Sequence, residues 1–266
     1  MSAPLLQLQG VSKRFGAVQA LRQVDFETQP GEVVALVGDN GAGKSTLIKL
    51  ISGILPIDEG QVLFEGKPVK LVGPQSASAL GIATVYQDLA LCDNLDVVGN
   101  LFLGRELRTG GLGALLGWLD ETAMEQQAAE LLKRLAVSIP SVRTQVASLS
   151  GGQRQSIAVA RSMMGSPKVV LLDEPTAALG VAQTRQVLEL IRRLRDQGLG
   201  VVVISHNLAD VFSVADRIVV MRLGRRVASF QVGAVSEVDV VAAITGAQPS
   251  SAAQESSKAS PKEGAP

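Results

Sequence analysis

The sequence is poor in the residues that support redox chemistry and metal cages. Its 266 residues include one cysteine and one histidine. A single cysteine, Cys92, excludes a disulfide within the chain and a zinc site built from several cysteines. We interpret Cys92 as a small, partly buried apolar residue.

An excess of charge of either sign is also missing. Lys and Arg together number 25, as do Asp and Glu, so the formal net charge is zero. This balance predicts no overall attraction to nucleic acid. No apolar run reaches the about 20 residues of a bilayer-spanning helix. The first residues lack the basic and apolar segments of a secretory signal, so we expect a cytosolic protein.

A glycine-rich segment stands between the apolar run Val33–Val37 and a helical pattern that starts at Leu47. Strand, turn and helix in this order are the context of a phosphate-binding loop. Glycines let successive N–H groups point into one concavity. Lys44 can then reach the β- and γ-phosphates, and the Ser45 hydroxyl can ligate Mg²⁺. The segment comprises Gly38, Asp39, Asn40, Gly41, Ala42, Gly43, Lys44, Ser45 and Thr46. By itself it leaves kinases, GTPases, helicases and transport ATPases as alternatives.

Two carboxylates follow the apolar run Val169–Leu172. Acidic residues often end strands, so the pair is informative only beside a phosphate loop. In that setting Asp173 is placed to hold Mg²⁺. Glu174 is placed to orient or deprotonate an attacking water.

Three further candidate site features lie next to predicted strands and helices. Gln87 succeeds the predicted strand Ile82–Tyr86, where its amide can ligate Mg²⁺ or bind the attacking water, although most glutamines are merely exposed. His206 follows the strand Val201–Ile204, where the ligands of such sheets bind, and it can contact a γ-phosphate. The residues Ser150, Gly151, Gly152 and Gln153 open a helical run and form a second anion site or, alternatively, a simple serine cap.

Alternating strands and helices predict an α/β protein with a doubly wound sheet. Strands are expected over Leu5–Val11 and Val18–Phe26, and a hairpin is expected with its turn at Leu223-Gly224-Arg225. Helical spacing over 95–103, 120–135 and 153–164, without strands between them, indicates a helical insertion. Residues 247–266 lack bulky apolar side chains and are predicted to be disordered.

All these motifs, in this order, resemble the nucleotide-binding domain of an ABC transporter. The resemblance implies a P-loop NTPase fold: an ABC-type ATPase core with an N-terminal antiparallel β subdomain and an inserted helical subdomain. It implies an ATP-binding domain over residues 1–246, with the helical subdomain at about 87–165, and ATP with Mg²⁺ as cofactors. The roles it implies are Walker A for Gly38–Thr46, Q-loop for Gln87, signature for Leu149–Gln153, Walker B and catalytic base for Asp173 and Glu174, and switch histidine for His206. Phe15 falls where the family stacks an aromatic ring on adenine, a contact of about 1 kcal/mol.

The resemblance also implies partners. The signature of one subunit closes the ATP site of another, so a second copy of the chain is expected. Two integral-membrane permease subunits and, indirectly, a periplasmic sugar-binding protein would complete the assembly on the cytoplasmic face of a bacterial inner membrane. No nucleic acid is expected.

Finer resemblance concerns the transported solute. The segments Leu91–Val97 and Asn100–Glu106 look like those of bacterial monosaccharide importer ATPases. A single domain favours a fructose-type system, with ribose and xylose as alternatives. A soluble ABC ATPase of translation or DNA maintenance, a regulatory module that binds ATP without turnover, and an exporter ATPase are the rival hypotheses.

One segment departs from the family pattern. After the Walker B residues the family usually has Ser-Ala-Leu-Asp, whereas this chain has Ala177-Ala178-Leu179-Gly180. The missing aspartate would contact the Walker A segment of the opposite subunit. Communication between two ATP sites is therefore expected to differ here.

Overall fold

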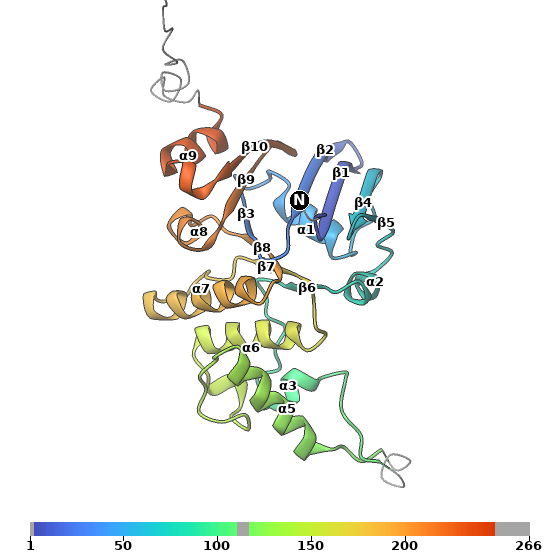
Figure 1. The fold of residues 1–266 in the computed structure, drawn as a ribbon, viewed down its shortest axis with the longest axis vertical. Coiled ribbons are helices and arrows are strands. Elements are labelled where there is room, and N and C mark those ends of the chain that lie inside the picture. The colour runs from blue at the N-terminus through green and yellow to red at the C-terminus, as the bar shows by residue number, and fades with distance from the viewer. Residues whose placement is uncertain (1–2, 111–116, 248–266) are drawn as a thin grey trace, which may run out of the picture.

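The computed structural model describes residues 3–110 and 117–247. The predicted disordered tail lies outside these residues, apart from Ala247. Two sheets organise the described part of the chain, and helices pack around them (Figure 1). The fold is the predicted α/β class.

The larger sheet has six strands in the order β10-β9-β3-β8-β7-β6. All neighbouring pairs from β9 to β6 are parallel, and only the edge strand β10 is antiparallel. The carboxyl ends of β3, β8, β7 and β6 therefore meet at one edge, where ligands of such sheets bind. The strands are β3 (Val33–Val37), β6 (Ile82–Val85), β7 (Val169–Asp173), β8 (Gly200–Ile204), β9 (Arg217–Arg222) and β10 (Arg225–Gln231).

Strand β3 shows why this sheet is buried on both faces. Its five residues are at most 1% exposed. Val33, Ala35 and Val37 belong to one hydrophobic cluster, whereas Val34 and Leu36 belong to the other. Side chains alternate between the faces of a strand, so a continuous apolar run predicts a strand with cover on both sides.

One face carries the smaller, antiparallel sheet, with strand order β2-β1-β4-β5. Pairing of β1 with β2 continues to Phe15 and Val18, so these strands are longer than the sequence predicted. The tight connection between them leaves Phe15 at the end of the hairpin. The elements are β1 (Leu6–Phe15), β2 (Val18–Thr28), β4 (Glu59–Phe64), β5 (Lys67–Val69) and, beside them, α1 (Lys44–Ile51) and α2 (Pro74–Ala79).

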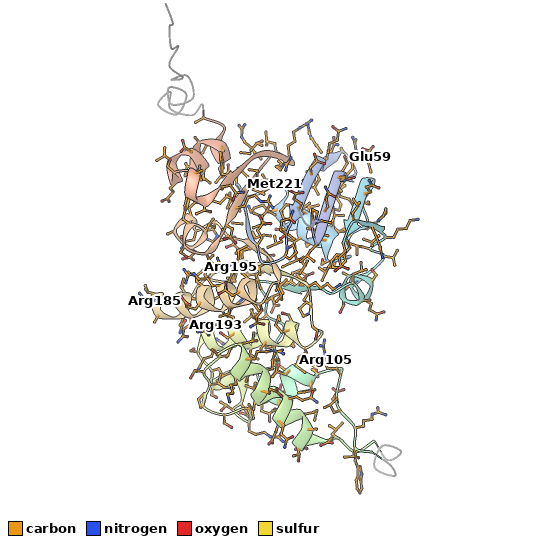
Figure 2. All side chains as sticks on the ribbon, in the orientation of Figure 1. Glu59, Arg105, Arg185, Arg193, Arg195 and Met221 are labelled. Atoms are coloured by element: carbon orange, nitrogen blue, oxygen red, sulfur yellow. The ribbon has the colours of Figure 1, made fainter. Side chains whose placement is uncertain are left out.

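The opposite face carries the helical part. Helices α3, α5 and α6 lie below α7 in Figure 1. Arg193 projects from α7 toward them (Figure 2) and donates to the carbonyl oxygens of Leu135 and Ala136. The elements are α3 (Val97–Phe102), α5 (Glu121–Arg134), η1 (Val146–Ser148), α6 (Gly151–Met163) and α7 (Val181–Asp196).

Helix boundaries differ from the sequence prediction for local reasons. Helix α6 begins at Gly151, earlier than expected, because Ser150 and Gln153 form a capping box that fixes its start. The short helices α2, α8 (Leu208–Val214) and α9 (Glu237–Thr245) were not predicted. Ser236 and Asp239 form a capping box at the start of α9, so its sequence signal was present but overlooked.

Within residues 3–110 and 117–247, every helix is too short or too polar to cross a lipid bilayer.

Candidate functional site

The predicted phosphate loop joins β3 to α1. Gly41 and Gly43 have φ values of 78° and 101°, a region in which glycine is favoured. A Cβ atom at Gly43 would lie 2.8 Å from Leu21 Cδ2 and 2.9 Å from the Ala20 carbonyl oxygen. Only glycine fits there, and the N-terminus of α1 consequently opens directly at the loop, which favours an anion.

Lys44 spans the loop. Its Nζ donates to the carbonyl oxygens of Gly38 at 2.6 Å and Asp39 at 3.0 Å. Burial lowers the pKa of the Lys44 ammonium, while the negative charges of Glu174, Asp39 and Asp173 oppose that shift. The Lys44 ammonium is thus held on the loop and feels the charges of Asp173 and Glu174, the two carboxylates for which the sequence predicted roles in phosphate chemistry.

The acidic pair ends β7. Burial raises the pKa of the Asp173 carboxyl, and the nearby Glu174 adds to the shift, whereas Lys44 and Lys49 oppose it. Glu174 has φ of 50°, uncommon for a residue with a side chain, and its N–H donates to the Ile204 carbonyl oxygen at 3.0 Å. Its Oε2 lies 2.8 Å from Nδ1 of His206. Backbone strain of this kind concentrates at functional sites.

An open hollow of 460 Å³ brings the predicted phosphate and water ligands together. It draws on the ends of β3, β6, β7 and β8, as the parallel sheet requires. Residues that line it are Gly38, Asp39, Asn40, Gln87, Glu174, Ala177 and His206.

A second hollow, of 440 Å³, lies on the other side of the loop. Phe15, 46% exposed, lines it together with the loop residues Asn40–Thr46. The Nζ of Lys13 lies 5.7 Å from the Phe15 ring centroid, a cation–π contact that holds the ring. Val18 and the hairpin residues Leu223 and Gly224 also line this hollow. The sequence predicted the hairpin but not its place beside the loop, which depends on β9 pairing with β3.

The signature residues lie elsewhere in the chain. The Ser150 hydroxyl accepts from the Gln153 N–H at 3.3 Å, and Gln153 Oε1 accepts from the Ser150 N–H at 3.0 Å. A Cβ at Gly152 would stand 2.8 Å from Gln183 Cβ. Among the described residues, neither of the two hollows beside the phosphate loop is lined by Ser150, Gly152 or Gln153. Gly151, however, lines a further hollow of 450 Å³ together with Gln87 and Glu174. The signature residues are thus apart from the phosphate loop, but Gly151 borders the side of the site that carries Gln87 and Glu174.

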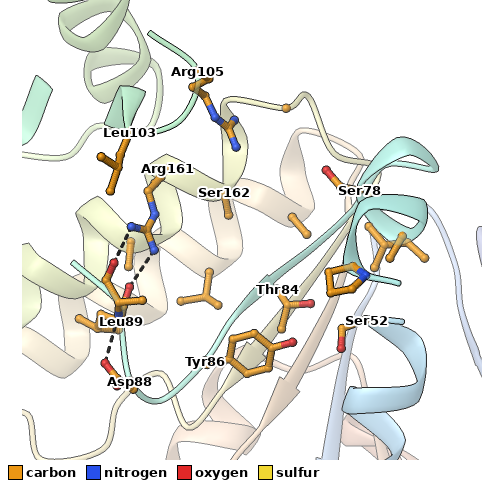
Figure 3. Close-up of a pocket in the computed structure, with 18 residues that line it drawn as sticks. Ser52, Ser78, Thr84, Tyr86, Asp88, Leu89, Leu103, Arg105, Arg161 and Ser162 are labelled. Atoms are coloured by element: carbon orange, nitrogen blue, oxygen red, sulfur yellow. Dashed lines mark hydrogen bonds between the residues drawn. The ribbon is translucent and has the colours of Figure 1, made fainter. Parts of the chain in front are cut away.

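A further hollow, of 320 Å³, lies between α2, β6 and α6 (Figure 3). Arg161 of α6 donates to the carbonyl oxygens of Ala90 at 2.7 Å and Leu89 at 2.9 Å, just beyond Gln87. Burial lowers the pKa of the Arg161 guanidinium. Arg161 was assigned no role from the sequence, because a helical pattern does not show that a side chain reaches a distant loop.

The sequence profile described as ABC transporter matches residues 21–177, more than half of the chain. The chain belongs to the ABC transporter family. It is 49% identical to the fructose import ATP-binding protein of Rhizobium meliloti over 92% of this chain and 95% of that protein. It is 50% identical to a xylose/arabinose import ATP-binding protein of Sulfolobus acidocaldarius over 83% of this chain and 86% of that protein. A ribose import ATP-binding protein of Rubrobacter xylanophilus is 44% identical, but this chain spans only 44% of its length.

Solved structures agree with this assignment. A nucleotide-free ATP-binding cassette of an ABC transporter aligns with a TM-score of 0.78 at 28% identity, covering 90% of this chain and 96% of that one. A dimeric cassette bound to ADP and Pi aligns with a TM-score of 0.69 at 25% identity, covering 85% and 98%. The fold is that of an ABC ATPase, which binds nucleotide.

The predicted magnesium ligands of this ABC ATPase suit the ion chemically. Ser45, Gln87 and Asp173 supply a hydroxyl, an amide and a carboxylate oxygen, and Mg²⁺ prefers oxygen. Mg²⁺ usually takes one or two carboxylates and completes its shell with substrate phosphates and water. The donor set therefore fits an ion that is brought with a nucleotide.

Gly180 is the N-cap residue that directly precedes α7 in this ABC chain. Its φ of −73° and ψ of 163° suit any residue, and a Cβ there would have no neighbour within 4 Å. The departure from the family aspartate is thus not forced by crowding.

Proposed function

We propose that the chain is the ATP-hydrolysing subunit of an ABC importer that carries a monosaccharide, with fructose as the first candidate and ribose and xylose as the alternatives. The observation that supports hydrolysis most directly is that Glu174 and His206 contact each other in one hollow with the loop residues Gly38–Asn40. Lys44 is held on the carbonyl oxygens of Gly38 and Asp39, close enough for the charge of Glu174 to act on its ammonium. The similar proteins serve the import of fructose, xylose/arabinose and ribose, which supports sugar import.

The roles follow from charge and reach. Lys44 and the loop N–H groups neutralise the β- and γ-phosphates, and Phe15 stacks on the adenine. Ser45, Gln87 and Asp173 would hold Mg²⁺, which neutralises charge on the phosphate oxygens. The Glu174 carboxylate orients and deprotonates water, and His206 contacts the γ-phosphate.

Ser150, Gly151, Gly152 and Gln153 serve a second copy of the chain. Their separation from the phosphate loop within one chain supports a two-fold dimer in which each signature closes the partner's nucleotide site. Each site is then incomplete until ATP brings the copies together.

The 320 Å³ hollow of Figure 3 is the contact we propose for a membrane permease subunit, at the cytoplasmic face of a bacterial inner membrane. Its wall includes Asp88, Leu89 and Ala90, which directly follow Gln87 in the sequence. A permease segment bound in this hollow would therefore contact the residues next to Gln87, which we propose as a magnesium ligand. Leu103, 48% exposed, adds an apolar contact. Leu103→Asp should abolish uptake while leaving ADP binding unchanged, and normal uptake by this variant would contradict the placement.

The test of the proposed function is uptake of labelled fructose, ribose and xylose in a strain lacking this chain. The strain is complemented with the wild type or with Glu174→Gln. Recovery of one sugar only with the wild type supports ATP-driven import and names the sugar. If the uptake of none of the three sugars depends on the chain, the proposal of monosaccharide import is wrong. In a separate fractionation, a chain that stays soluble with or without permease subunits would favour a non-transport ATPase.

A further inference from the structure

The turn between β9 and β10 carries an unusual residue. Leu223 and Gly224 form a two-residue connection, since Arg222 pairs directly with Arg225. Their φ values are 48° and 74°. Positive φ at both central residues is the requirement of a type I′ turn, which favours Asn, Asp or Gly at the first position. Leucine there carries backbone strain that a polar turn residue would avoid.

Packing within the chain does not compensate for this strain. The Leu223 side chain is 74% exposed, so it contributes little to the hydrophobic core. A strained and exposed large apolar residue is an unfavourable choice for a turn that only has to reverse the chain. The combination of strain and exposure indicates that Leu223 contacts another molecule.

The surroundings of Leu223 identify that contact. It lines the 440 Å³ hollow with Phe15 and Val18, the latter 66% exposed, so three large apolar side chains face the same space. The rest of the lining is mainly the phosphate loop, Asn40–Thr46. An occupant that meets all these residues has phosphates at one end and a flat apolar group at the other, as a nucleotide does.

The hairpin is fixed against the loop. The Gly224 N–H donates to the Ala42 carbonyl oxygen at 3.1 Å, and the Arg22 N–H donates to the Gly224 carbonyl oxygen at 2.8 Å. Strands β10 and β2 are also in contact, and they lie side by side at the top of Figure 1. Leu223 is therefore presented to the hollow from a rigid turn.

We propose that Leu223 is a contact residue for the purine base of the nucleotide, acting together with Phe15. The inference rests on the proposed ATP-binding function. The base gains apolar cover from Leu223, while Phe15 supplies the aromatic stack. In this view Leu223 favours nucleotide binding but lowers the stability of the turn.

The experiment compares Leu223→Asn with the wild-type full-length chain. Asn suits the turn, so the melting temperature should stay equal or rise, while the Kd for MgADP should increase about fivefold, equivalent to about 1 kcal/mol. Calorimetric titration with inorganic pyrophosphate, which has no base, should give an unchanged Kd. Leu223→Gly, which also accepts positive φ, should repeat the result, and Leu223→Met should bind MgADP as the wild type does. Val227→Thr, on the same hairpin but outside the hollow, is the matched control.

An unchanged Kd of Leu223→Asn and Leu223→Gly for MgADP would overturn the proposal. Equal weakening of MgADP and pyrophosphate would also overturn it, because the turn would then act through Ala42 and the phosphate loop. Failure of the proposed function has a different signature: the wild type itself would not bind MgADP, or Lys44→Ala would bind it equally well.

Discussion

Glu174 Oε2 lies 2.8 Å from Nδ1 of His206, and the two side chains are 17% and 75% exposed. The contact joins the ends of the neighbouring strands β7 and β8. It presents a largely enclosed carboxylate next to an accessible imidazole. A base held on one side by the protein and a ring open to an incoming phosphate suit the hydrolysis proposed above.

Replacing Glu174 by Gln should lower the rate of ATP hydrolysis by at least about 100-fold, because an amide cannot accept the proton of the attacking water. MgADP binding should remain. Phosphate release by the chain assembled with its permease gives the rate, and gel filtration with ATP should reveal a trapped dimer. A monomer under these conditions, even with the membrane subunits, would contradict the two-copy arrangement.

Asp173→Asn should stabilise the nucleotide-free chain at neutral pH. The pKa of Asp173 is raised in the folded chain, chiefly by burial, so the folded state binds its proton more tightly than the unfolded state. Stability that depends on this proton is present at low pH and is lost as the pH rises through the folded pKa. The melting temperatures of variant and wild type should therefore diverge above the ordinary aspartate pKa and converge below it.

The matched control for that experiment is Glu59→Gln, an exposed carboxylate on β4. Its melting temperature should stay close to that of the wild type, because surface substitutions change stability little. Asp173→Asn should also weaken the dependence of nucleotide binding on Mg²⁺. An Asp173→Asn chain that is less stable than wild type at neutral pH would mean that the carboxylate makes a stabilising contact there.

Arg161→Ala should destabilise the fold by about 2 kcal/mol, since charged hydrogen bonds contribute about 1.5–3 kcal/mol each and water replaces part of the loss. The change should also loosen the segment after Gln87, which Arg161 binds at Leu89 and Ala90. Denaturant titration measures the first effect, and faster amide exchange over residues 88–92 measures the second. Arg134→Ala, an exposed residue of α5, should change stability by less than about 0.5 kcal/mol. Equal exchange in both variants would count against a positioning role.

Gly180→Asp should be accommodated and should stabilise the chain by about 0.5 kcal/mol, because an acidic residue suits the start of a helix. If the missing aspartate weakens communication between two ATP sites, the Hill coefficient for hydrolysis in the assembled complex should rise in this variant. Gly180→Ala, which adds a Cβ without a carboxylate, serves as the control. Strong cooperativity in the wild type would show that the loop does not need the aspartate.

The sequence alone indicated the fold class and the family, because each motif is local. Glycines of the phosphate loop, the apolar run before Asp173 and the capping box at Ser150 each have a physical cause within a few neighbouring residues. The division of the chain into domains and the roles of the site residues remain predictions.

Only the tertiary structure decided which of these segments meet. Strand order places Gln87, Glu174 and His206 beside the loop at Gly38, since parallel pairing brings the ends of separate strands to one edge. It also brings the Leu223 turn against the loop and lets Arg161 reach Leu89. Such contacts join residues far apart in the chain, and no local propensity or spacing encodes them. The sequence determined which chemical groups are present, and the pairing of the strands determined which of these groups lie next to one another.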